Sequence, residues 1–223
     1  MRKFGRINRT LLLQLPTMRR TPQKSLPMTL SAVAILLLLF LFFALCEKGA
    51  GWSANEKTVI NGQGVMRVLT IDDRDDSLFL RKPCKDLTLK EIRSAEYATL
   101  ANRMLVTVTS PEQDGVGIAG PQVGIGRRVV AVQRFDKEGE PFEVYPNIRV
   151  TSKRGDPEPG PEGCLSVPGR RGEVLRWQDI DIAYTSPSTG IDTTDRIQGF
   201  TAVIFQHETD HLDGILYIDK LTQ

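Results

Sequence analysis

Histidine and cysteine are scarce in this chain, and their scarcity limits the chemistry available to it. Only two histidines, His207 and His211, occur in 223 residues. Three cysteines are an odd and small number, which argues against a framework of disulfides. The sequence has no internal repeats, and 40% of its residues are hydrophobic. This composition predicts one well-packed core plus an appendage.

Acidic residues are absent from the first 46 positions, which hold seven Lys and Arg. The rest of the chain therefore has 22 of the 29 basic residues and all 27 acidic residues, a net charge of −5. A domain of this sign is not expected to attract nucleic acid. We predict a basic N-terminal segment over residues 1–27 and no nucleic-acid partner.

Charged residues of either sign are missing from residues 25–46, a stretch of 22 residues rich in Leu and Phe. A helix of this length reaches about 30 Å, enough for the apolar part of a bilayer. No polar residues recur with the helical period, as they would in a core helix of a soluble domain. We predict a transmembrane or signal-anchor helix over 28–46, with the basic flank in the cytoplasm and the remainder exported.

Three alternatives to a single-pass membrane anchor remain open. The apolar run could be a cleaved signal peptide, although its preceding region is long. Cys46 could carry a lipid, but Leu45 is bulky where lipoprotein signals have a small residue. Translation could also begin at Met66, and the protein would then be cytosolic.

Beyond the apolar run, the sequence predicts a Gly-rich linker over 47–64 and a catalytic domain over 65–223. Thr88 and Glu91 form a capping-box pattern that opens a helix to about Leu105. Gly214 is the expected stop of a second helix that follows residues 199–205. The remaining expected elements are strands at 128–133, 142–150 and 180–185, and an irregular Pro-rich loop at 157–161.

The two histidines lie four residues apart with a glutamate between them, in the pattern H-E-x-x-H. On a helix this spacing puts both imidazoles on one face, where they can bind one metal ion. Glu208 would then lie beside a water on that metal. Zinc proteases of the extended pattern have a third histidine where this chain has Tyr217. Cys164 is a candidate for the third ligand, because a thiolate with two imidazoles leaves one coordination position open. Alternatively, Cys164 is a buried apolar thiol that binds no metal.

Three stretches, in this order, resemble the motifs of peptide deformylases. They are GVGIAGPQ at 115–122, EGCLS at 162–166 and QHETDHL at 206–212, and the resemblance covers about residues 65–223. Members of this family remove the formyl group from the N-terminal methionine of new polypeptides. The resemblance implies an α+β fold with antiparallel sheets around a central helix that carries H-E-x-x-H; in this chain the single hydrophobic helix would precede it.

The resemblance also implies roles for individual residues. The metal ligands are Cys164, His207 and His211, the general acid/base is Glu208, and the oxyanion donors are the Gln122 side chain and the Leu165 backbone N–H. Gly115 and Gly117 would let the substrate pair as an added strand. Arg171 would lie near the bound peptide, and the pocket for methionine is expected at Phe200, Val203 and Ile204, for which core packing is the alternative.

One departure from the family pattern is Gly120, which stands where a second alanine is usual and is expected to loosen the loop that carries Gln122. The cofactor is expected to be one divalent metal ion, Fe(II) first, with Zn, Ni or Co as alternatives. The expected substrate and partner is an N-formylated polypeptide. Two other functions stay open: a related N-acyl amidase of the same fold, and an inactive module that binds formyl peptides.

Overall fold

A computed structural model describes residues 35, 37 and 51–222 of the chain. Apart from Ile35 and Leu37, the predicted membrane segment at 28–46 lies outside these residues. Within the described part, no helix has both the length and the apolar character needed to cross a bilayer. The domain helices are α2 (Ala54–Ile60), α3 (Arg74–Leu80), α4 (Leu89–Ile92), α5 (Ala95–Val108) and α6 (Phe200–Leu212), with 3-10 turns η1 (Gly120–Val123) and η2 (Tyr217–Asp219).

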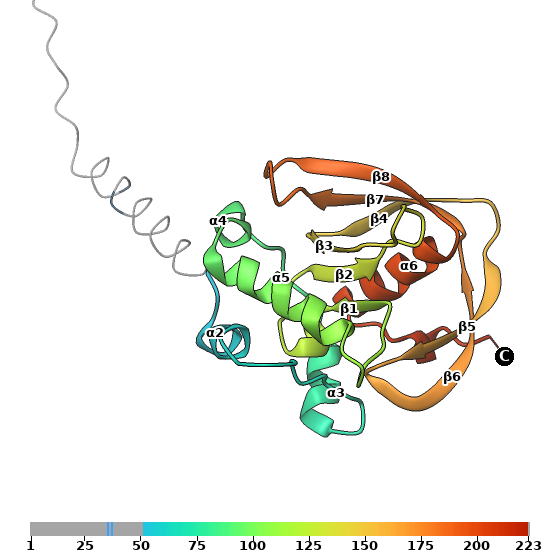
Figure 1. Cartoon of the computed structure of the whole chain (residues 1–223), viewed down its shortest axis with the longest axis horizontal. Helices are drawn as coiled ribbons and strands as arrows, with labels where there is room; N and C mark the ends of the chain where they lie inside the picture. Colours follow the sequence, from blue (N-terminus) through green and yellow to red (C-terminus); the bar gives the residue numbers. More distant parts are fainter. Residues whose placement is uncertain (1–34, 36, 38–50, 223) are drawn as a thin grey trace, which may run out of the picture. The chain divides into compact units, whose positions relative to one another are not determined.

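The strands form three small antiparallel sheets (Figure 1). Their bounds are β1 (Gly117–Ala119), β2 (Val129–Gln133), β3 (Phe142–Pro146), β4 (Arg149–Arg154), β5 (Glu158–Cys164), β6 (Val167–Arg176), β7 (Asp179–Thr185) and β8 (Asp192–Gln198). The sheet orders are β1-β2-β3, β4-β7-β8 and β5-β6. Helix α6 packs against strands of the first two sheets, so the predicted α+β fold around the H-E-x-x-H helix is confirmed.

Helix α6 is held in the interior by its apolar residues. Phe205 and Leu212 are fully buried in a cluster with side chains of β2, β3 and β7. The helix ends where Gly214 adopts a left-handed φ of 75°. A Cβ at this position would approach the Arg81 carbonyl oxygen to 2.5 Å, so both the conformation and the space require glycine. The predicted stop is confirmed.

The helix predicted from Thr88 to Leu105 is two helices. The capping box is present, since the Thr88 hydroxyl accepts from the Glu91 N–H and the Glu91 carboxylate accepts from the Thr88 N–H. Helix α4 then stops after one turn. Ser94 takes an extended conformation and its hydroxyl accepts the Tyr97 N–H, which starts α5. Ser94 is a favourable N-cap residue, and its extended conformation separates α4 from α5.

One strand prediction and one loop prediction were also wrong in part. The stretch 142–150 is divided between two sheets, because Asn147 adopts a left-handed φ of 58° between β3 and β4. Asparagine is one of the few residues that tolerates this conformation. The Pro-rich segment at 157–161 lies mostly in β5 instead of an irregular loop. β5 belongs to a two-stranded ribbon, where a proline on an edge strand loses no essential ladder donor.

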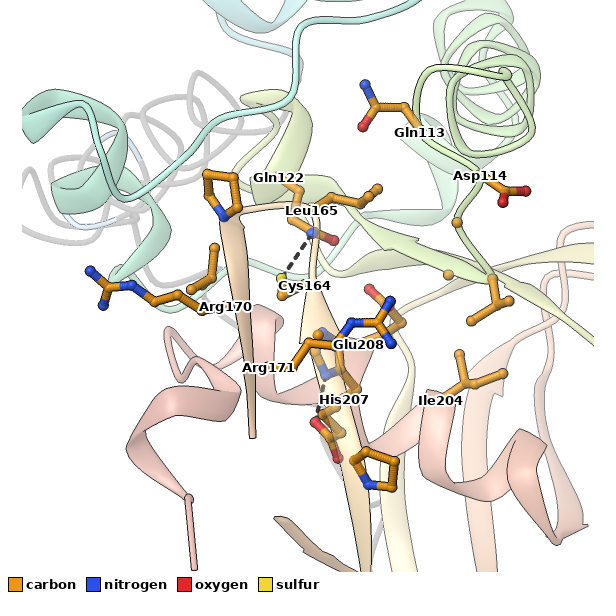
Figure 2. A pocket seen from close by; sticks show the side chains of 18 of the residues that line it. Gln113, Asp114, Gln122, Cys164, Leu165, Arg170, Arg171, Ile204, His207 and Glu208 are labelled. Atoms are coloured by element: carbon orange, nitrogen blue, oxygen red, sulfur yellow. Dashed lines mark hydrogen bonds and ion pairs between the residues drawn. The ribbon is translucent and has the colours of Figure 1, made fainter. Parts of the chain in front are cut away.

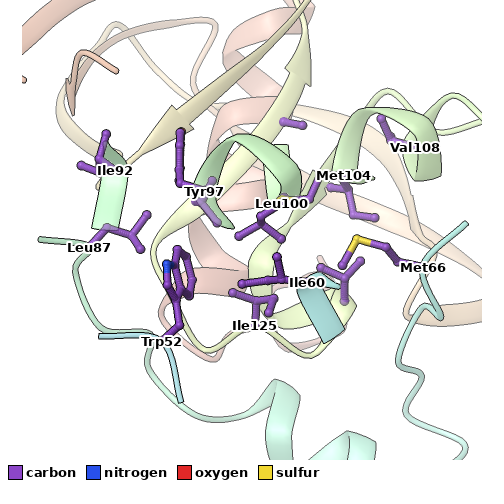
Figure 3. Packing of buried hydrophobic residues seen from close by; sticks show 14 residues of the cluster. Trp52, Ile60, Met66, Leu87, Ile92, Tyr97, Leu100, Met104, Val108 and Ile125 are labelled. Carbon is purple, nitrogen blue, oxygen red and sulfur yellow. The ribbon is translucent and has the colours of Figure 1, made fainter. Parts of the chain in front are cut away.

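The linker predicted over 47–64 is structured from residue 51 onward. Helix α2 has a capping box between Ser53 and Glu56, and Trp52 and Ile60 are buried in the same cluster as α5 side chains (Figure 3). The Glu56 carboxylate accepts from Arg127 at 2.7 Å. A few large contacts hold this segment to the domain, although its glycines and low apolar content are typical of a linker.

Candidate active site

Three side chains from two distant parts of the chain converge at one point; Figure 2 shows two of them, Cys164 and His207. The Cys164 sulfur and the His207 and His211 ring nitrogens lie within 4.8 Å of one another. Cys164 Sγ and His211 Nε2 are 3.2 Å apart. His207 uses Nδ1 for another contact, so its Nε2 is the nitrogen left for a metal. One soft sulfur and two imidazole nitrogens are a donor set that fits a transition-metal ion.

The local fold explains this convergence. The histidines lie one turn apart on α6, as the spacing predicts. Cys164 is the last residue of β5, next to the tight turn into β6, where the pairing shifts register between Gly163 and Cys164. The Ser166 N–H points at the sulfur from 3.4 Å. The turn therefore presents the sulfur toward α6.

Behind His207 lies a buried chain of charged groups that the sequence did not reveal. His207 Nδ1–H donates to Glu162 Oε2 at 2.8 Å, and Arg176 donates to both Glu162 oxygens at 2.6 and 3.1 Å. Arg176 also donates to Asp210 at 2.6 Å. A carboxylate on the far nitrogen of a ligand histidine orients the ring and raises its basicity. Glu162 was part of a recognised motif, but no spacing signal pointed to Arg176.

The protonation of these groups follows from their surroundings. Burial raises the pKa of Glu162, and hydrogen bonds from His207 and Arg176 outweigh this and lower it to about 2. Burial lowers the pKa of His207, while its contacts with Cys164 and Glu162 raise it to about 10. For His211, which is 1% exposed, burial lowers the pKa well below its usual value. The lowered pKa favours neutral His211, the form that binds metal, and a metal on His207 would take the place of the proton on its Nε2.

Glu208 is a buried carboxylate with a free oxygen. It is 4% exposed, and its Oε2 has no hydrogen-bond partner in the part of the chain that the structure describes. Burial raises its pKa to about 7, which suits a group that takes and returns a proton near neutral pH. A Cβ at Gly117 would come within 2.6 Å of Glu208 Oε1. Gly117 therefore makes room for the carboxylate, a reason for glycine that the sequence did not suggest.

The Gln122 amide is oriented by the backbone. Its Oε1 accepts the Ala119 N–H at 2.8 Å, so its Nε2 faces the site, 3.6 Å from Cys164 Sγ and 3.3 Å from Ser166 Oγ. The expectation that Gly120 loosens this loop is wrong. A Cβ at Gly120 would lie 2.7 Å from the Arg127 carbonyl oxygen, so the loop packs tightly against the chain there.

A cavity of about 970 Å³ opens beside these groups. Every residue predicted to contact substrate lines it: Gly115, Gly117, Arg171, Phe200, Val203 and Ile204, together with Leu165. Ile204 is buried and Phe200 is exposed at 55%. Strand β1 is an edge strand with β2 on one side only. Arg170 and Asp114, which the sequence analysis did not single out, also line the cavity (Figure 2).

Comparison with known proteins places this arrangement in a family. Residues 65–223 match the family described as Polypeptide deformylase. A peptide deformylase of Symbiobacterium thermophilum is 40% identical over 143 residues, which cover 64% of this chain and 62% of that protein. One of Halothermothrix orenii is 37% identical over 142 residues, covering 64% and 84%.

Solved structures agree with this match. The crystal structure of peptide deformylase from Thermotoga maritima is 30% identical, with a TM-score of 0.63, and covers 72% of this chain and 100% of that one. The actinonin-bound class I type b peptide deformylase of Acinetobacter baumannii is 32% identical, with a TM-score of 0.62 and the same two coverages. From the family match, these relatives and the shared fold, we conclude that the chain belongs to the peptide deformylase family.

Proposed function

We propose that this chain hydrolyses the N-formyl group of polypeptides that begin with formyl-methionine, and that the residues of the cavity carry out the reaction. Removal of the formyl group from new polypeptides is the activity of the family, and the chain is a metallo-hydrolase. The observation that carries the assignment of residues is the convergence of Cys164, His207 and His211 beside Glu208.

The proposed ligands of one divalent metal are Cys164 Sγ, His207 Nε2 and His211 Nε2. Mixed thiolate and imidazole donors suit Fe(II), which we propose as the native ion, with Zn, Ni or Co as substitutes. When bound, such an ion supplies Lewis-acid chemistry that brings the pKa of a coordinated water toward about 7. The buried Glu162 supports this role, since it holds His207 by the nitrogen that faces away from the sulfur.

Glu208 is the proposed proton carrier. Its unpartnered Oε2 would accept a proton from the attacking water and deliver it to the departing amine nitrogen as the carbon–nitrogen bond breaks. The products are formate and a free N-terminal methionine. A pKa of about 7 lets the carboxyl group perform both transfers at neutral pH.

Gln122 and the backbone N–H of Leu165 are the proposed donors to the negative oxygen that forms on the formyl carbon. The Ala119 N–H holds the Gln122 carbonyl, so the amide NH₂ is aimed before substrate arrives. A donor fixed in advance costs no reorganisation during the reaction.

The substrate is proposed to bind as an extended strand along the free edge of β1, near Gly115 and Gly117. Its methionine side chain would enter between Val203 and Ile204 of α6, with Phe200 at the more exposed end. Arg171 lines the same cavity from β6 and is proposed to contact the peptide beyond the methionine.

A pair of cysteine variants tests the assignment. Cys164→Ala in the full-length chain should lose the bound metal and the hydrolysis of a formyl-Met peptide. Cys84→Ala is the matched control, since Cys84 is also a partly buried thiol but lies outside the cavity. Metal content and formate release, measured in both variants, test whether Cys164 is a metal ligand. Full metal occupancy in Cys164→Ala would refute the ligand set.

A further inference from the structure

A second cavity lies beside the metal helix and takes no part in the proposed reaction. It has a volume of about 670 Å³. Helix α6 lines it with Gln206, Thr209 and Asp210, and Asp213 follows directly after the helix. The proposed ligands His207 and His211 lie on the same helix. We call this the basic cavity, after its five cationic side chains: Arg128, Arg149, Lys153, Arg176 and Lys220.

The cations of the basic cavity come from separate elements and are unequally neutralised. Arg128 pairs with Asp213, and Arg149 with Asp86. Arg176 and Lys220 share the Asp210 carboxylate, at 2.6 and 2.7 Å. In the described part of the chain, Lys153 is the member of this set that pairs with no carboxylate. The cavity therefore carries an uncompensated positive charge.

Lys153 is an exposed side chain that packs on an aromatic ring. Its Nζ lies 4.2 Å from the centre of the Trp177 ring, an aromatic side chain that also lines the cavity. Partial burial lowers the pKa of Lys153, Lys220 and Arg176 lower it further, and the Asp210 carboxylate raises it. Arg176 and Lys220 are compensated by Glu162 and Asp210, so one positive charge is left over, at Lys153. An added anion would compensate that charge.

We propose that the basic cavity binds a small molecule that carries a phosphate group, with the phosphate between Lys153 and Lys220. The buried Arg176 adds positive charge to the same cavity, while its guanidinium N–H groups donate to Glu162 and Asp210. The volume leaves room for an organic part against Trp177, Val150 and Leu175. The ligand would touch the ion pairs that extend through Arg176 to Glu162.

The chain offers its own reporter for this binding. It has two tryptophans, Trp52 in the core and Trp177 in the basic cavity. In a full-length Trp52→Phe protein in non-ionic detergent, emission comes from Trp177 alone. Titration with inorganic phosphate at constant ionic strength should change this emission with single-site saturation. Lys153→Ala in the same background should raise the apparent Kd at least about tenfold.

The controls separate this cavity from the surface and from the metal centre. Lys137→Ala should leave the Kd unchanged, because Lys137 is paired with Glu143 outside the cavity. Cys164→Ala should also retain phosphate binding, because the basic cavity does not use the metal. Absence of saturation, an unchanged Kd in Lys153→Ala, or loss of binding in Cys164→Ala would each overturn the proposal. Tighter binding of acetate than of phosphate would overturn the choice of ligand class.

Discussion

Three of the proposed reactive groups have a neighbour that orients them or leaves room for them. Ala119 orients the Gln122 amide, Glu162 orients the His207 ring, and Gly117 leaves space for the Glu208 carboxylate. Groups fixed in this way give up little entropy when the substrate binds. Single substitutions should therefore separate metal binding, proton transfer and oxyanion stabilisation.

We expect Glu208→Gln to retain the metal and to lose formyl-Met peptide hydrolysis by at least about 10²-fold, the scale for a positioned acid/base. Glutamine preserves the volume against Gly117 but cannot accept and return the proton. Metal analysis and kcat measured on the same preparation check this. Near-normal activity with full metal content would remove Glu208 from the proposed mechanism.

Gln122→Ala should lower kcat by about 10²–10³-fold with little change in KM, as for the loss of one oxyanion donor. The reason is that its Nε2 faces the thiolate side of the cavity while its Oε1 is already occupied. Gln113→Ala, at the rim of the same cavity, is the control and should change kcat much less. An effect on KM alone would reassign Gln122 to substrate binding.

Replacing Glu162 by Gln should weaken metal binding about 10–100-fold, because it removes the carboxylate that holds His207 Nδ1. Arg176 would also lose one of the two carboxylates with which it forms buried ion pairs. Competition with a chelator gives the affinity. Glu158→Gln, an exposed carboxylate on the same strand, should bind metal as the unmodified chain does. Equal affinities in the two variants would contradict the proposed role.

Among the secondary-structure elements, α2 and the residues before it are the least expected part of the domain. Arg127 donates to Glu56 at 2.7 Å and to the Gly51 carbonyl at 2.8 Å, and its guanidinium lies 5.4 Å from the Trp52 ring. Ile60 is fully buried against α5. This segment precedes residues 65–223, which carry the family match, and still completes the core.

Trp52→Ala should lower the free energy of unfolding by about 3–5 kcal/mol, the range for removing a buried tryptophan. The substitution also removes the hydrogen bond from Trp52 Nε1 to Ser94 Oγ. Leu78→Ala, at an exposed helix position, should cost less than about 0.5 kcal/mol. Denaturant unfolding of the full-length variants measures both. A chain that begins at Met66 should be destabilised for the same reason, and equal stability would show that the segment is dispensable.

At the scale of the whole molecule, we propose that residues 28–46 anchor the protein in a membrane with the enzyme domain outside the cytoplasm. The support is the uncharged stretch of bilayer length and the seven basic residues before it. After carbonate washing, the full-length chain should stay in the membrane pellet. External protease on spheroplasts should digest the domain. Recovery of a soluble protein that begins at Met66 would refute the anchor and leave the site assignments unaffected.

The sequence by itself determined the features that depend on near neighbours. The i, i+4 spacing of His207 and His211 required only a helix to put both rings on one face, and Gly214 required only its backbone conformation to end that helix. The order of three motifs identified the family, and with it the general α+β fold. Each of these signals lies within a short window of the chain and needs no distant partner.

Only the tertiary structure decided the features that depend on distant partners. Cys164 contacts His211, which lies 47 positions away in the sequence. Arg176 forms ion pairs with both Glu162 and Asp210, and no spacing pattern in the sequence predicts them. Ser94 divided a predicted helix, and residues 51–64 became part of the core instead of a linker. Apart from the local cap at Ser94, the deciding free energy comes from burial and pairing between segments far apart in sequence, which local propensity cannot report.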